Sequence, residues 1–203
     1  MAPNMSLFSI NAILIISTDD SSRIFAKYYN APHAPHGTPA NSTNYPGANP
    51  YPTLKDQKAF EKGLLEKTAK TTNDIILYDN RIVVFKMESD VMLYVVGGAD
   101  ENEILLFNAI LALRDSLTIL LKNSVDKRTI IENYDLVSLA IDELCDDGVL
   151  LETDPVTIVT RVSKPPPQDI GMPKGGIELS EQGLLNFWEF GKAKVAESIR
   201  RTL

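Results

Sequence analysis

Apolar and polar residues alternate in the first segment that the sequence predicts to be regular. Within Leu7–Ser17, every second residue over Phe8–Ile16 is apolar, whereas the positions between them include Ser9 and Asn11. A repeat of two residues indicates a β-strand, here with one side that faces a dry core. After a polar turn, Arg23–Tyr29 predicts a second strand. We therefore expect the domain to open with a β-hairpin.

A proline-rich insert then breaks the pattern. Residues 30–52 contain six prolines, two glycines and no charged residue, which predicts a disordered or weakly ordered loop without structural weight. Both histidines of the chain, His33 and His36, lie in this loop. Imidazole is a common metal ligand, but no Cys, Asp or Glu lies nearby to complete a site. We therefore expect no metal there.

A helix is predicted directly after the insert. Thr53 followed by Asp56 forms a capping-box start, and the residues that recur every four positions over Phe60–Thr68 continue a helix to about Lys70. One face of this helix should cover a sheet.

Three dense apolar segments, at 73–79, 81–87 and 91–98, predict three further strands. Asp79 and Asn80 both tolerate positive φ, so the short junction at these residues predicts a tight antiparallel hairpin. The strands are rich in Val, Ile and aromatic residues and show little alternation. This composition is typical of strands covered on both faces, so we expect helices on both sides of the sheet.

The longest helical pattern covers Glu101–Lys122. Its main apolar stripe is widened by Ile104, Phe107 and Leu111 beyond what one amphipathic face requires. This helix should be buried on more than one side. The main stripe consists of Leu106, Ile110, Leu113, Leu117 and Leu121.

The C-terminal third predicts another helix, an arm, a linker and a final helix. Glu132–Cys145 has helical periodicity and should end with Gly148 as its C-cap, and 149–163 reads as an extended arm. Residues 163–179, rich in Pro and Gly, predict a linker between a domain at 1–162 and an amphipathic helix at 180–203. The apolar face of that helix contains Leu184, Trp188, Val195 and Ile199.

Charge and composition narrow the function. The chain has 20 Lys and Arg against 27 Asp and Glu, a net charge of −7, which disfavours nucleic-acid binding. No run approaches the roughly 18–20 apolar residues of a membrane span. The final helix has four basic and three acidic residues, so we expect it to dock on protein rather than on lipid. Cys145 is the only cysteine and cannot form an internal disulfide, which favours a reducing, cytosolic setting. The apolar run Ile10–Ile16 lacks the preceding basic residues of a secretory signal.

No arrangement of residues predicts catalysis. Cys145 is the only cysteine and lies near no basic residue that would activate it, so we expect it to serve packing. The acidic residues Asp142, Glu143, Asp146 and Asp147 could hold a cation, but such clusters on a helix are usually solvated. We therefore expect no catalytic, metal-binding or cofactor-binding residue, and no enzyme.

The order of elements predicts an α+β fold with helices around an antiparallel sheet. Four long segments, at 13–29, 54–68, 83–106 and 125–155, resemble the zeta subunits of coatomer, which are similar to the small sigma chains of clathrin adaptors. The segment "FKMESDVMLYVVGGADENE" carries the small-chain likeness. The segment "VDKRTIIENYDLVSLAIDELCDDGVLLE" favours zeta over sigma.

The resemblance implies a longin-like fold with five antiparallel strands, one helix on one face and the other helices on the opposite face. It also implies a structural subunit of the COPI vesicle coat that pairs with the gamma subunit and joins the other coatomer subunits. An Arf-type GTPase recruits this coat to Golgi membranes for transport toward the endoplasmic reticulum. The chain itself would then meet the membrane only through the assembled coat.

A partner surface follows from the excess of apolar residues on the long helix. We expect the partner against one flank of this helix and the neighbouring strand 91–98. The candidate partner-binding residues are Leu93, Val95, Leu106, Phe107, Ile110, Leu113 and Trp188. Two alternatives remain: a sigma-type chain that helps bind dileucine cargo peptides, and a longin-type fusion protein. The second needs a heptad coil and a membrane anchor, and neither follows Val162.

Overall fold

The computed structural model describes residues 7–30 and 49–163. Five strands form one sheet in the order β2-β1-β5-β4-β3, and all neighbouring strands are antiparallel. These strands are β1 (Ile10–Ser17), β2 (Arg23–Tyr28), β3 (Ile75–Tyr78), β4 (Arg81–Glu88) and β5 (Val91–Gly98). The predicted α+β class, the opening hairpin and the three later strands are confirmed.

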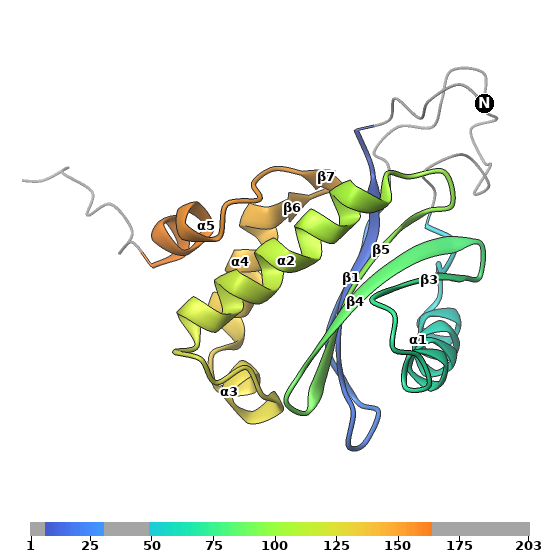
Figure 1. The fold of residues 1–203 in the computed structure, drawn as a ribbon, viewed down its shortest axis with the longest axis horizontal. Helices are drawn as coiled ribbons and strands as arrows, with labels where there is room; N and C mark the ends of the chain where they lie inside the picture. Colours follow the sequence, from blue (N-terminus) through green and yellow to red (C-terminus); the bar gives the residue numbers. More distant parts are fainter. Residues whose placement is uncertain (1–6, 31–48, 164–203) are drawn as a thin grey trace, which may run out of the picture. The chain divides into compact units, whose positions relative to one another are not determined.

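Helices cover both faces of the sheet (Figure 1). Helix α1 (Leu54–Thr68) lies on one face, and the other face carries the remaining helices. These are α2 (Glu103–Leu120), α3 (Lys127–Glu132), α4 (Tyr134–Leu144) and α5 (Pro155–Val162). The two apolar cores are therefore separated by the sheet, with Leu14 and Tyr94 in the α1 core and Ile13 and Leu93 in the other.

Local sequence signals explain several element boundaries. Asp79 and Asn80 have φ values of 50° and 56°, as the tight turn between β3 and β4 requires. Thr53 is the N-cap of helix α1, and its hydroxyl accepts a hydrogen bond from the Asp56 amide at 3.2 Å. Asn102 is the N-cap of helix α2, and its side-chain oxygen accepts a hydrogen bond from the Ile104 amide at 2.9 Å. The cap predicted for the first helix is confirmed.

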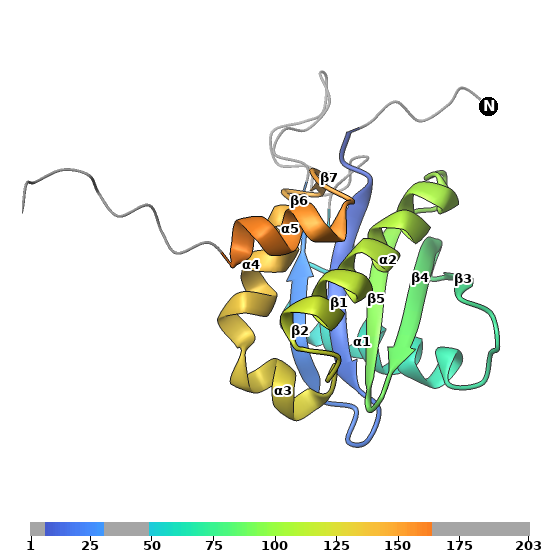
Figure 2. The same cartoon turned by 60° about the vertical axis from the view of Figure 1, so that its left-hand side comes forward.

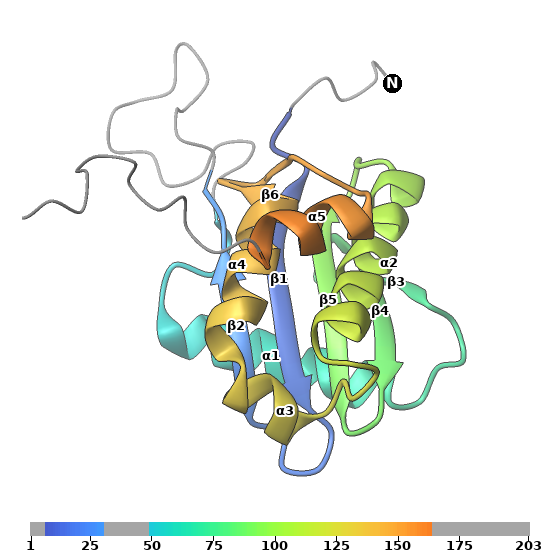
Figure 3. The ribbon, with the colours of Figure 1, turned by 90° about the vertical axis from the view of Figure 1, so that its left-hand side faces the viewer.

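Helix α2 is buried on more than one side, as its wide apolar stripe predicts. Its sheet-facing residues, such as Leu106 and Leu113, are fully buried against β4 and β5. Its opposite flank contacts α4 and α5, and α5 crosses between these two helices (Figures 2 and 3). The surplus apolar width is therefore covered in part by helices of the same chain.

Strand β1 differs from the expectation of a single dry side. Every residue of β1 is buried, including Ile13 and Ile15 on one face and Leu14 on the other. The strand lies between β2 and β5 and is covered by helices on both faces. The polar residues Ser9 and Asn11 mark the end of the strand rather than a wet face, and Asn11 accepts a hydrogen bond from Arg81.

Two predictions for 125–163 are wrong. Helix α4 does not end in a glycine cap: it passes directly into the hairpin of β6 (Cys145–Asp146) and β7 (Val149–Leu150), with Gly148 at φ 84° in the turn. The predicted extended arm is helical from Pro155, because Asp154 caps α5 and Ile158 packs into the core. The short helix α3 was also not predicted.

The proline-rich insert is ordered where it reaches α1. Tyr51 is 7% exposed, stacks on Phe60 with a 4.2 Å centroid separation and donates a hydrogen bond to Asp79 at 2.6 Å. The expectation that 30–52 carries no structural weight is therefore wrong for Tyr51. Residues 31–48, most of the predicted linker, the predicted terminal helix and Trp188 lie outside the described residues.

Candidate partner interface

Five of the candidate partner-binding residues lie inside the domain. Leu93, Val95, Leu106, Ile110 and Leu113 have no exposed surface, because they form the core between the sheet and α2. Strand β5 is also central in the sheet, between β1 and β4, so no partner can reach its edge. The prediction that these five residues contact a partner is therefore wrong, because the core of the domain buries them. Phe107, in contrast, is partly exposed.

An exposed apolar surface lies along α2 and the edge strand β3. We call it the α2–β3 flank and define it by Ile75, Leu77, Ile104, Phe107 and Leu111. Ile104 is 71% exposed, Leu77 is 61% exposed and Ile75 is 38% exposed. Ile75 and Leu77 share the sheet face of the buried Val84 and Ile82, their partners on β4, and this is the face that α2 covers. Exposed apolar side chains from two elements therefore lie along one side of the domain.

The sequence alone did not single out Ile75 or Leu77, and it did not predict that Ile104 is the most exposed residue of the three. The β3 sequence Ile-Ile-Leu-Tyr is apolar throughout, so its pattern does not reveal which residues face solvent. Only the sheet order shows that β3 is an edge strand whose Ile76 and Tyr78 lie on the α1 face. The unusual width of the α2 stripe is the one signal in the sequence, and it points to the helix that carries the 71% exposed Ile104.

Charged side chains border the α2–β3 flank. The Lys86 ammonium lies 5.0 Å from the centre of the Phe107 ring. The same ammonium forms an ion pair with Asp74. At the far end of β4, Arg114 of α2 approaches Glu88 at 3.9 Å. The Leu77 carbonyl accepts a hydrogen bond from Lys67 at 3.3 Å, which occupies one outward backbone group of β3. The flank is apolar at its centre and polar at its rim, as protein interfaces are.

Cys145 and the acidic cluster at 142–147 both lie in the part of the chain that the structure describes. Burial raises the pKa of the Cys145 thiol to about 11, so the thiol is protonated at neutral pH and is a poor nucleophile. Asp142 pairs with Lys27 at 2.6 Å and Glu143 with Arg161 at 3.3 Å, so both belong to surface ion pairs. Within residues 7–30 and 49–163, no group of three His, Cys, Asp or Glu side chains could hold a metal ion. Over the same residues, no helix is long and apolar enough to span a membrane.

Comparison with known proteins decides the family. The model of the clathrin adaptor complex small chain family matches residues 9–166. The chain belongs to this family. Coatomer subunit zeta of Saccharomyces cerevisiae is 39% identical over 203 residues, covering 98% of this chain and 99% of the yeast protein. Coatomer subunit zeta-1 of Homo sapiens is 39% identical over 158 residues, covering 78% of each chain.

Among the adaptor small chains, these relatives are coatomer zeta subunits, which confirms the resemblance seen in the sequence. A similar fold is found in the structure titled "Homology model of the full-length AP-3 complex in a stretched open conformation". One chain of it superimposes with a TM-score of 0.51 over 75% of this chain and 90% of that chain, at 17% identity. At this identity the likeness concerns the fold, and it agrees with the longin-like arrangement.

Proposed function

We propose that this chain is the zeta-type structural subunit of a COPI coat and that it pairs directly with the gamma subunit through the α2–β3 flank. The family and its coatomer zeta relatives support the coat assignment. The observation that supports the surface is the exposure of Ile104 and Leu77 beside the partly buried Phe107. Exposed apolar side chains that gather on one side of a domain mark protein contacts more often than single scattered ones do.

The same proposal accounts for membrane association without a lipid-binding element. The coat would hold the chain at Golgi membranes, with an Arf-type GTPase acting on the coat rather than on this subunit alone. The remaining coatomer subunits would then be indirect partners. Cytoplasmic location follows from membership of such a coat, and no enzymatic role is proposed.

Introducing a positive charge on the apolar surface tests the pairing. We expect Ile104→Lys and Leu77→Lys each to weaken capture of co-expressed gamma by at least about tenfold, because a lysine would have to be buried at the contact. Both positions are exposed, so the fold should tolerate the change. Ile119→Lys, at the C-terminal end of the same helix and 48% exposed, is the matched control.

The measurement is the amount of gamma that co-purifies with the tagged chain, followed by dissociation rates of the pair. We also expect the wild-type chain alone to be poorly soluble and the two lysine variants to be more soluble, because they remove exposed apolar area. Normal capture by both flank variants would place the interface elsewhere. Absence of gamma from the wild-type preparation would reject the pairing itself.

A second candidate function is recognition of dileucine cargo peptides by a sigma-type chain. The α2–β3 flank offers a cation, Lys86, next to the Phe107 ring, which suits a peptide with an acidic residue and two leucines. Lys86 is already paired with Asp74, which weakens this alternative. Titration of an isolated gamma–zeta pair with such a peptide separates the two functions, because a scaffold should not bind it.

A further inference from the structure

A cavity of about 350 Å³ lies on the α1 face of the sheet. It is enclosed by the end of α1, the connection at 69–74, and strands β4 and β5. Its volume lies at the lower end of the range of ligand pockets, so it could hold one or two side chains of a partner. Its apolar lining includes Leu65, Phe85, Met87 and Met92.

Several of the polar groups around this cavity already have partners. The Thr68 hydroxyl lies 3.0 Å from the Leu64 carbonyl and 2.8 Å from the Tyr94 hydroxyl. The Asp74 carboxylate is held by Lys86. The other polar lining residues, such as Thr71 and Thr72, are uncharged. A charged ligand group would therefore lose its hydration without a counter-charge, whereas an apolar side chain would bury its surface favourably.

Next to the cavity, strand β4 has an edge that β3 does not cover. The pairing of β3 with β4 ends at Ile75 and Val84, and the Phe85 amide then donates to the Asp74 carbonyl at 2.9 Å. Successive residues of a strand point their N–H and C=O groups to opposite sides. Since the backbone N–H and C=O groups of Phe85 point away from β5, those of Met87 do so too. Within the described residues, no strand lies beside Met87 on that side.

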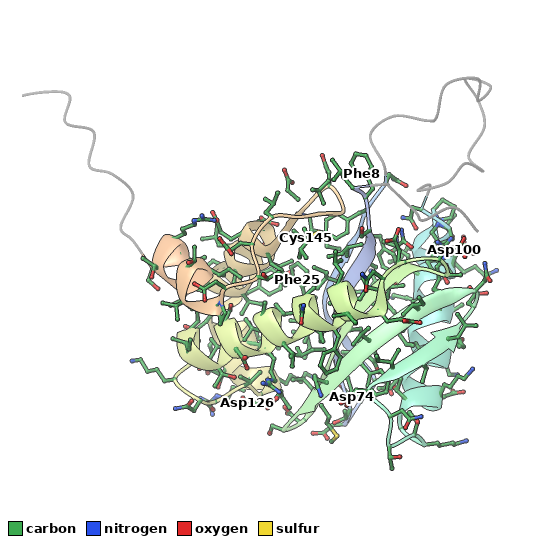
Figure 4. The ribbon with its side chains drawn as sticks, turned by 45° about the horizontal axis from the view of Figure 1, so that its top comes forward. Phe8, Phe25, Asp74, Asp100, Asp126 and Cys145 are labelled. Atoms are coloured by element: carbon green, nitrogen blue, oxygen red, sulfur yellow. The ribbon has the colours of Figure 1, made fainter. Side chains whose placement is uncertain are left out.

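The cavity and the α2–β3 flank meet at this edge. Lys86 points to the α2 face, where it contacts Phe107, and its ammonium binds Asp74. Asp74 in turn lines the cavity on the α1 face, and Figure 4 shows it beside the ribbon of β4. One ion pair therefore connects the two surfaces. A partner that covers the flank needs only to pass around the sheet edge to reach the cavity.

We propose that an extended segment of the gamma subunit passes around the β3–β4 edge, pairs with the backbone of Met87 and inserts one apolar side chain into the cavity. Addition of a strand to an open edge supplies backbone hydrogen bonds, and the cavity selects the side chain. This inference rests on the proposed function, because its occupant is the same partner. It extends the contact from one face of the sheet to both.

Photo-cross-linking in the co-expressed pair tests the position of the segment. The photoreactive amino acid p-benzoylphenylalanine is placed at Thr72, which is exposed on the cavity rim, and at Lys58, which is exposed on α1 outside the cavity, as a control. We expect Thr72 to cross-link to a single short stretch of gamma and Lys58 to give no product. A pair that assembles normally but yields no cross-link from Thr72 would contradict the proposal.

Filling the cavity provides a second test. Ala69 is exposed and lines the cavity, so Ala69→Trp should occupy it without disturbing the core, and Leu54→Trp at the exposed start of α1 is the control. In the pair, we expect the Met87 amide to exchange about tenfold faster in Ala69→Trp than in wild type or the control. Equal exchange in all three pairs would overturn this inference while leaving the gamma pairing intact. Failure of the wild-type pair to form would overturn both.

Discussion

Glu61 lies on the buried side of α1, where its carboxylate accepts hydrogen bonds from three groups of β2. Arg23 donates from Nε at 3.0 Å and from Nη2 at 2.6 Å, and the Tyr28 hydroxyl donates at 2.8 Å. Burial and the Glu61 charge raise the pKa of Tyr28, so its hydroxyl stays a donor throughout the physiological range. A charged contact therefore joins α1 to β2, and no local sequence pattern predicts it.

Loss of the Arg23 guanidinium should lower the stability of the fold. The Glu61 side chain is 8% exposed and that of Arg23 is 24% exposed, so Arg23→Met leaves a nearly buried carboxylate without its partner. We expect the free energy of unfolding to fall by about 2–4 kcal/mol, somewhat below the cost of breaking a fully buried pair. Urea denaturation of the dilute full-length chain, followed by circular dichroism, measures the change.

The matched control is Arg128→Met, because Arg128 pairs with Glu132 at the surface, where the two side chains are 86% and 57% exposed. A surface pair of this kind contributes about 0–1 kcal/mol. Equal effects of the two arginine substitutions would show that the Glu61 contact does not hold α1 to the sheet.

At the scale of elements, α5 illustrates a helix whose start is explained only once its packing is known. Asp154 accepts hydrogen bonds from the Thr157 amide at 2.9 Å and from its hydroxyl at 2.5 Å, and Pro155 follows at a position where no amide donor is needed. The helix has only eight residues and depends on the burial of Ile158. The sequence shows the cap, but it does not show which apolar residues from other elements pack on Ile158 and stabilise so short a helix.

Removal of this cap should loosen α5. We expect Asp154→Ala to destabilise the helix by about 1 kcal/mol, whereas Asp154→Asn keeps an oxygen acceptor and should cost less. Hydrogen exchange of the amides at 158–162 reports the change. No difference between the Ala and Asn variants would show that the cap does not control this helix.

The same residue predicts a pH dependence. Hydrogen bonds from Thr157 lower the pKa of Asp154 below its usual value. A lowered pKa in the folded state adds stability above the unfolded value of about 3.9, and that stability is lost as the pH falls further. Protection of α5 should therefore decline below about pH 4 in wild type, and this decline should be smaller in Asp154→Asn.

At the scale of the whole molecule, Tyr51 distinguishes the end of the proline-rich insert that packs on the domain from the segment 31–48 that we expect to be replaceable. Tyr51 joins the insert to both α1 and the β3–β4 turn through Phe60 and Asp79. The stacked ring fills part of the α1 core, whereas the composition of 31–48 predicts a segment without structural weight. The two parts of the insert should thus respond differently to replacement.

Replacing 31–48 by a short Gly/Ser linker should leave stability and gamma binding almost unchanged, because loop closure changes by only about 0.6 kcal/mol for each halving of length. Extending the replacement through Tyr51 should cost about 2–4 kcal/mol, since a buried aromatic side chain is lost. Thermal unfolding and co-purification of gamma measure both effects. A large loss from the first replacement alone would contradict the prediction.

The sequence by itself determined the elements that depend on near neighbours. The turn at Asp79-Asn80, the Thr53 cap and the helical period of α2 act within a few residues, so their patterns survive without knowledge of the fold. Dense apolar strands also indicated a sheet covered on both faces. Together with the resemblance to adaptor small chains, these local signals were sufficient for the architecture.

Only the tertiary structure decided which apolar residues are left for a partner. Leu113 and Ile104 belong to the same wide stripe, but α5 and the sheet bury the first and leave the second 71% exposed. Likewise, Ile75 and Ile76 are adjacent and chemically identical, and the pleat of the strand points them to opposite faces; because β3 is an edge strand, Ile75 stays 38% exposed while Ile76 packs against the α1 core. Exposure depends on contacts between segments far apart in the chain, and hydrophobicity records only that a residue prefers burial, not what buries it.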